Sequence, residues 1–299
     1  MMLEAAAVAS RLAQYVVLLG LFGAAAYHVY AASSAPPPSR GGFGFAAAAA
    51  VVVASLAFAV QAAQLTGSMS GAMEPSTHWA IITGMAMGLA WCVRVLALLA
   101  IVLLLAAAPA DRKSMPAVAV LSGIALSSLA WNGHGAGGEG PAGLVRLGST
   151  AIHLLAAGLW FGALIVFLRD LVAWRRREVA AMHAGLAGFA GVGSLSVALL
   201  LGTGLLNAYF LVGIDWRSVF VSLWGRLLLV KLALFVTMLA LAAANRFTLT
   251  PALSRSLGSG GDHTAAVAGL RRSLVLETAA AFSVVALVAW LGTLSPTSS

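Results

Sequence analysis

The sequence is poor in charged residues. Only 9% of its 299 residues are Asp, Glu, Lys or Arg, whereas 61% are hydrophobic. A soluble domain carries about 25% charged residues, so this chain has too few to cover a surface that faces water. Most of its surface must therefore face lipid, and the bilayer is an expected partner.

Cysteine is nearly absent, since Cys92 is the only one and lies within an apolar run. A disulfide framework is therefore excluded. The sequence also lacks a Gly-rich phosphate-binding loop with Lys-Ser/Thr, a metallohydrolase histidine pair on one helix and a Ser/His/Asp set. Its acidic residues are too scattered to form a general acid–base couple, so we predict that the protein is not an enzyme.

Alternation of apolar and polar residues, which would indicate a membrane β-barrel, is also missing. Instead, runs of roughly 20 apolar residues recur, each long enough to cross a bilayer as a helix. They predict an all-α polytopic membrane bundle of about eight transmembrane helices, forming a single domain over residues 1–299. The predicted helices span about 11–32, 43–65, 79–107, 115–131, 149–168, 185–212, 225–244 and 272–294.

The net charge of +8 comes from basic residues at helix ends and in short loops, so nucleic acid is not an expected partner. These residues concentrate on one side of the predicted bundle, and the positive-inside rule places that side in the cytoplasm. Both termini then lie on the outer side of the membrane. The cytoplasmic set is Arg40, Arg112, Lys113, Arg169, Arg175, Arg176, Arg177, Arg246, Arg255, Arg271 and Arg272, against Arg11, Arg146, Arg217 and Arg226 outside.

Two glycine motifs suggest an internal repeat. Gly20-Leu21-Phe22-Gly23 lies in the first predicted helix, and Gly158-Leu159-Trp160-Phe161-Gly162 lies in the fifth, which runs in the same direction. Two parallel four-helix halves, an arrangement known in transporters, would explain the likeness. Coincidence in a chain rich in glycine and leucine explains it equally well.

Two histidines lie near the outer side of the predicted bundle. His134 follows the fourth predicted helix, and His153 lies about one turn inside the fifth, so both imidazoles can reach the outer mouth. Imidazole binds copper as either Cu(I) or Cu(II). The alternatives are a solvated His134 beside a glycine helix cap and a His153 that hydrogen-bonds to another helix.

Further soft ligands surround the start of the third predicted helix. The preceding loop contains Met69, Met73 and His78. On a continuous helix, His78, Met85 and Cys92 would share one face because they are spaced by seven residues, and thioethers favour Cu(I). The same pattern also arises from one buried stripe, since methionine fills gaps in hydrophobic packing and buried cysteine behaves as a small apolar residue.

Few polar residues lie inside the predicted helices, namely Arg94, Lys231, Glu277 and Asn207. An unpaired charge in the membrane is costly. We therefore expect an Arg94–Glu277 ion pair between the third and eighth predicted helices, with a proton relay as the alternative. Lys231 is expected to extend outward toward Asp215.

Several longer motifs resemble the bacterial copper resistance protein D (CopD) family. They are Gly133-His134, His153 to Leu164, Gly202-Thr203-Gly204-Leu205-Leu206-Asn207, Leu223 to Lys231, Ala243-Ala244-Asn245-Arg246, and Glu277 after Arg271-Arg272-Ser273. The resemblance extends from about residue 80 to the end of the chain. It implies a location in the bacterial inner membrane, with both termini in the periplasm, and copper movement from periplasm to cytoplasm. It also implies a role in copper homeostasis and a separate periplasmic CopC-like copper-binding protein as partner.

The sequence thus favours a copper permease that captures the ion with His134, His153 and methionines at the periplasmic face. The alternative is a haem-binding membrane oxidoreductase or an oxidase-assembly factor, because buried histidines in helical bundles also hold haem. His28 and His153 are expected at different depths, which disfavours a bis-histidine haem site. A copper sensor without flux is a third hypothesis.

Overall fold

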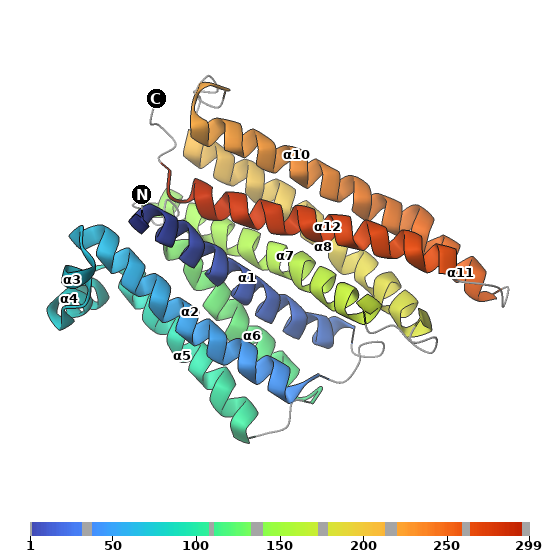
Figure 1. Cartoon of the computed structure of the whole chain (residues 1–299), viewed down its shortest axis with the longest axis horizontal. Helices are drawn as coiled ribbons and strands as arrows, with labels where there is room; N and C mark the ends of the chain where they lie inside the picture. The colour runs from blue at the N-terminus through green and yellow to red at the C-terminus, as the bar shows by residue number, and fades with distance from the viewer. Residues whose placement is uncertain are drawn as a thin grey trace.

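The chain forms a bundle of long helices packed side by side (Figure 1). The structure is a computed structural model that describes residues 2–31, 38–107, 111–132, 140–172, 179–212, 220–258 and 264–294. Over these residues it contains helices and no β-strand. The first helix begins and the last helix ends at the same end of the bundle, which we call the terminal face (Figure 1). The other end is the opposite face.

Seven helices within the described residues are long and apolar enough to cross a membrane. They are α1 (Met2–Tyr30), α2 (Arg40–Thr66), α5 (Ala86–Ala107), α7 (Gly140–Val172), α8 (Val179–Val212), α10 (Leu223–Ala244) and α12 (Thr264–Leu291). The eighth predicted crossing is a shorter apolar helix, α6 (Met115–Ser127), which continues as the 3₁₀ helix η1 (Ser128–Trp131). The predicted all-α polytopic membrane bundle is confirmed.

The third predicted helix is broken near its start. In place of one helix over 79–107, α4 (Pro75–Gly84) and α5 are separated by Met85, whose backbone is extended at φ −130° and ψ 137°. The end of α4 packs tightly on α5, because a Cβ on Gly88 would lie 2.6 Å from the Cα of Ile82. His78, Met85 and Cys92 therefore do not share one helix, and the predicted ladder on a single helical face is wrong.

The central helices α1 and α7 cross through glycines. A Cβ on Gly23 would overlap the carbonyl oxygen of Gly158 and lie 2.6 Å from the Cα of Gly162. Small residues allow the backbones of membrane helices to approach this closely. The two glycine motifs that suggested a repeat therefore meet in one crossing.

The remaining helices flank this central pair. On one side α2 and α6 pack against α1, and α5 packs against α2 and α6; on the other, α8 packs against α7, and α12 packs against α1, α7 and α10 (Figure 1). Arg40, at the start of α2, donates hydrogen bonds to the carbonyl oxygens of Leu105 (2.6 Å) and Ala106 (2.5 Å) at the end of α5. This contact satisfies carbonyls that the helix end leaves without partners.

The helix that starts with α10 does not end at Ala244. It continues through a π-helical segment, η3 (Asn245–Leu249), into α11 (Thr250–Gly258). A π-helical segment carries an extra residue per turn and often occurs at functional sites. Here it directs Asn245 and Arg246 toward the space between α7, α8 and α12.

Candidate functional site

A cavity of about 220 Å³ lies in the terminal half of the bundle, where α1, η1, α7, α8, α10 and α12 converge. We call it the terminal cavity. Its polar lining consists of Arg11, Tyr15, Asn132, Arg146, Thr150, His153, Asn207 and Lys231. Three of the residues singled out from the sequence, His153, Asn207 and Lys231, are therefore brought together by the fold.

Helical spacing accounts for this convergence. Arg146, Thr150 and His153 follow one another at intervals of four and three residues on α7, so they share one face. Lys231 occupies the equivalent place in α10, at the end of a similarly spaced series that begins at Trp224. The structure also shows that α7 starts at Gly140, well before residue 149, so His153 lies deeper along its helix than one turn.

Thr203 fixes the imidazole of His153. The ring Nδ1 lies 2.9 Å from the Thr203 Oγ1, and the Thr203 hydroxyl itself donates to the carbonyl oxygen of Leu199. With the Thr203 hydroxyl proton directed at Leu199, the neutral tautomer that satisfies this contact carries its proton on Nδ1 and donates it to Thr203. The other ring nitrogen, Nε2, then keeps a free lone pair and has no hydrogen-bond partner among the described residues.

A histidine held in this way is suited to bind a metal. Metal-ligating histidines usually donate the second ring N–H to a protein oxygen, which sets the tautomer and the ring orientation. The cross-helix hydrogen bond foreseen as the alternative for His153 is thus present, and it leaves Nε2 available. Sequence reasoning missed Thr203 as its partner, although Thr203 lies four residues before Asn207 and so on the same face of α8.

Amides provide further polar atoms in the terminal cavity. The Thr150 hydroxyl lies 3.5 Å from the Oδ1 of Asn207, at the limit of a hydrogen bond. The Oδ1 of Asn132 is buried and has no hydrogen-bond partner within the described ranges. A buried acceptor without a partner is costly, so it marks a place where a ligand or a water molecule would be held.

The charge of the terminal cavity is positive. Arg11, Arg146 and Lys231 line it, and no described carboxylate does. Arg11 is partly engaged, since it donates to the carbonyl oxygen of Gly292 at 2.6 Å. Sequence reasoning had assigned Arg11 and Arg146 to membrane topology alone. Like charges repel, so coordination by imidazole rather than Coulomb attraction would have to supply the affinity for a metal cation.

The methionine-containing segment lies elsewhere on the terminal face. The short helices α3 (Met69–Ala72) and α4 pack on α2 and α5, neither of which lines the terminal cavity. Met69 and Met73 are exposed, at 53% and 76%, whereas the His78 ring lies 5.6 Å from that of Phe58. The structure therefore does not bring these candidate ligands to His153.

Two further predicted residues bear on the ligand set. His134 and Asp215 lie outside the described residues, so the predicted approach of Lys231 to Asp215 stays a prediction. Among the described ranges, no three His, Cys, Asp or Glu side chains gather as a metal site. His28 lies in the last turn of α1 beside Phe43, at the opposite face, so it does not form a haem-binding pair with His153.

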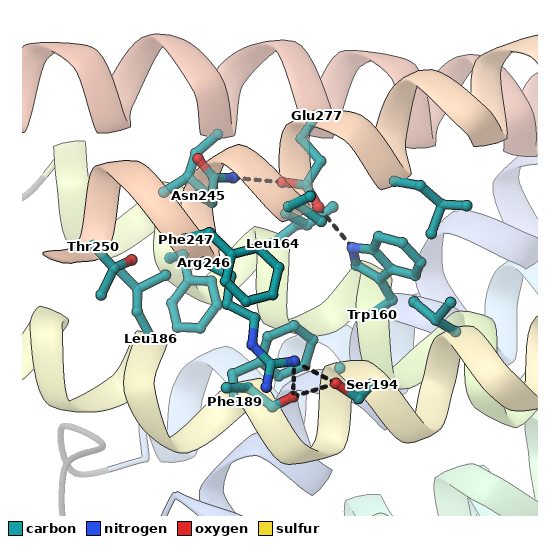
Figure 2. A pocket seen from close by; sticks show the side chains of 18 of the residues that line it. Trp160, Leu164, Leu186, Phe189, Ser194, Asn245, Arg246, Phe247, Thr250 and Glu277 are labelled. Carbon is teal, nitrogen blue, oxygen red and sulfur yellow. Dashed lines mark hydrogen bonds between the residues drawn. The ribbon is translucent and has the colours of Figure 1, made fainter.

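The predicted ion pair between Arg94 and Glu277 is wrong. Arg94 is only 1% exposed, and its Nε donates to the Ser128 Oγ at 2.9 Å. Glu277 instead accepts hydrogen bonds from the Trp160 Nε1 at 2.7 Å and the Asn245 Nδ2 at 2.8 Å (Figure 2). The two charges are separated because α5 packs on α2 and α6, whereas α12 packs on α1, α7 and α10.

Comparison with known proteins gives a consistent assignment. Residues 2–144 match the family described as the copper resistance protein D-like N-terminal domain, and residues 183–291 match copper resistance protein D. Copper resistance protein D of Pseudomonas syringae pv. tomato is 36% identical over 300 residues, covering 97% of this chain and 96% of that protein. Inner membrane protein YebZ of Escherichia coli (strain K12) is 27% identical over 247 residues, covering 81% and 80%. No solved structure matches the chain.

Proposed function

Because the chain belongs to the copper resistance protein D family, we propose that it carries copper ions across the bacterial inner membrane. The observation that carries this proposal is the state of His153. Its Nδ1 is fixed by Thr203 and its Nε2 is free at a cavity inside a membrane bundle. A preoriented, unprotonated imidazole nitrogen is a ligand for copper in either oxidation state.

The proposed direction is inward, with the terminal face in the periplasm. The described loops and helix ends at the opposite face carry most of the basic residues, including Arg40, Arg112, Lys113 and Arg255. Such an excess is typical of cytoplasmic loops. Copper would then enter the terminal cavity from the periplasm and leave toward the cytoplasm.

The exposed methionines suit a separate step in this proposal. Met69 begins the short helix α3 and Met73 caps its end, and both are exposed at the terminal face, where they have no core to fill. Thioethers bind Cu(I), and exposed thioethers can exchange the ion with another protein. We assign them to the first contact with a periplasmic CopC-like carrier, before copper reaches His153 and His134.

The test is metal analysis of the purified protein together with copper uptake into vesicles that contain it. Wild type is expected to bind and accumulate copper, and His153→Ala, alone or with His134→Ala, is expected to abolish both. Thr237→Ala is the matched control, because Thr237 is exposed on α10 and bonds only its own helix. Equal copper content in the wild type and the double variant would contradict the proposal.

A Soret absorption band in the purified protein would support the haem alternative instead.

A further inference from the structure

A second cavity, of about 730 Å³, lies between α7, α8, α12 and the continuous helix formed by α10, η3 and α11. We call it the opposite cavity, because it lies toward the opposite face. Its described lining is mainly apolar and aromatic, and no histidine, cysteine or methionine is among the described residues that line it. Glu277, Trp160, Asn245, Arg246 and Ser194 supply its main polar groups (Figure 2).

Glu277 is a buried carboxyl that has no cationic partner among the described residues. It is 3% exposed, and both of its hydrogen-bond donors, Trp160 and Asn245, are neutral. Placing an uncompensated carboxylate in a low-dielectric interior is costly, whereas the neutral acid avoids that cost. Glu277 therefore either carries a proton or needs a cation that the described residues do not provide.

The elements that surround Glu277 offer no such cation. The cavity residues of α7, α8, α10 and α11 include no charged side chain, and η3 contributes only Arg246. Arg246 extends toward α8, where it donates to the Ser194 Oγ at 2.5 Å and to the Ala190 carbonyl oxygen at 3.3 Å (Figure 2). No ion pair joins Arg246 to Glu277 in the described structure.

Asn245 supplies an independent sign of a small polar ligand. It is 7% exposed, and while its Nδ2 donates to Glu277, its Oδ1 is buried and finds no hydrogen-bond partner in the described part of the chain. An orphaned acceptor beside a carboxyl can hold a water molecule or a hydronium ion. The π-helical segment that starts at Asn245 places this acceptor in the cavity lining.

We propose that Glu277 is an exchangeable proton site that communicates with the opposite face through the opposite cavity. Hydronium in the cavity gives a proton to the carboxylate oxygen of Glu277 and becomes water, and the reverse transfer releases it. The cavity extends from buried Glu277 to the exposed Arg246 and Ser254, which provides the route. A link between this proton and copper movement rests on the proposed function; the proton site itself does not.

Copper is a poor occupant of this site. The donors near Glu277 are its own carboxylate and one amide oxygen, and the described part of the lining offers no sulfur or imidazole ligand. Such oxygen donors suit protons and hard cations better than Cu(I). Two oxygens also fall short of the six to eight ligands that a hard cation such as Ca²⁺ takes.

The test is infrared difference spectroscopy of the purified, copper-free protein across a pH titration. The wild type is expected to show the carbonyl stretch of a protonated carboxyl that disappears as pH rises, and Glu277→Gln is expected to lose this band. Glu74→Gln is the control, because Glu74 is an exposed carboxyl with no side-chain cap hydrogen bond. A pH-dependent buried-carboxyl band that persists in Glu277→Gln would overturn the proposal, as would its absence from the wild type.

Asn245→Ala keeps the carboxyl and removes one donor, so it serves if Glu277→Gln does not fold. It is expected to shift both the band frequency and the pH of its disappearance, and an unchanged band would contradict the site. Loss of the band on adding copper, together with lower copper stoichiometry in Glu277→Gln, would make this a copper site instead. If copper uptake failed while the Glu277 band remained, the proposed copper transport would be refuted and the proton site would stand.

Discussion

Gly23 of α1 and Gly162 of α7 are so close that a Cβ added to Gly23 would lie 2.6 Å from the Cα of Gly162. This contact fixes the crossing of the two central helices. His153 and Trp160, which line the terminal and opposite cavities, lie on α7 on the N-terminal side of Gly162. The crossing therefore sets the positions of both candidate sites relative to α1.

Gly23→Ala is expected to destabilise the bundle, because the new methyl group overlaps the Gly158 carbonyl oxygen and the backbones must separate. Overpacking of this kind costs about 1–3 kcal/mol. The measurement is thermal unfolding in detergent. Gly202→Ala is the matched control, since Gly202 lies inside α8 with nothing near its Cβ position. The control should be neutral or more stable by up to about 1 kcal/mol, from the higher helix propensity of alanine. Equal destabilisation of the two variants would contradict the close crossing.

Thr203→Val is expected to weaken copper binding by about 10- to 100-fold, the usual effect of losing the partner that orients a metal-ligating histidine. Valine has nearly the shape of threonine but cannot accept the His153 N–H. Thr237→Val is the matched control, because its hydroxyl also bonds a carbonyl four residues earlier and touches no ligand. Copper titration of the purified variants gives the comparison, and unchanged affinity in Thr203→Val would show that the Thr203 bond does not prepare the ligand.

Lys231→Leu is expected to tighten copper binding in the terminal cavity, because it removes a positive charge that lines the same cavity as His153 and adds no donor atom. Each 1.4 kcal/mol of relieved repulsion corresponds to about a tenfold gain in affinity. Lys113→Leu is the control, since Lys113 is exposed near the start of α6 at the opposite face. Isothermal titration at low salt is the measurement, and weaker binding in Lys231→Leu would mean that copper enters with an anionic ligand held by Lys231.

A double-mutant cycle of Arg94→Met with Glu277→Gln is expected to be additive within about 0.5 kcal/mol, because the two side chains share no partner. A cycle of Trp160→Phe with Glu277→Gln is expected to show coupling, since the indole N–H donates directly to Glu277 at 2.7 Å. Unfolding free energies of the single and double variants give both values. Strong coupling in the first cycle would indicate that Arg94 and Glu277 interact directly, as the sequence had predicted.

The contact between the two glycine motifs could be predicted from the sequence only in part. The likeness of the segments around Gly23 and Gly162 is visible in the sequence, but a pattern of small residues only says that some backbone approaches closely. It does not say which one. The contact between the two motifs depends on the path of the chain between them, and local spacing does not encode that path.

The helix break at Met85 shows a second limit. A run of apolar residues from Trp79 onward predicts one membrane helix, because hydropathy averages over the whole window. At Met85 the backbone is extended, and the Gly88 backbone packs closely against Ile82 on the other side of the break. No proline or charged residue marks the break in the sequence, and Gly84, at the end of α4, is the one local signal there.

The membrane location and the helical class follow from the amino-acid sequence. A chain with 61% hydrophobic and 9% charged residues must satisfy its backbone within lipid, and runs of roughly 20 apolar residues do so as helices. The motifs also indicated the copper resistance family and His153. The packing of the helices shows in addition that Thr203 orients His153, that Lys231 lines the same cavity, and that Glu277 bonds Trp160 and Asn245 rather than Arg94. The spacing of residues along a helix fixes which of them share a face. Which faces of different helices come into contact depends on how the whole helices pack.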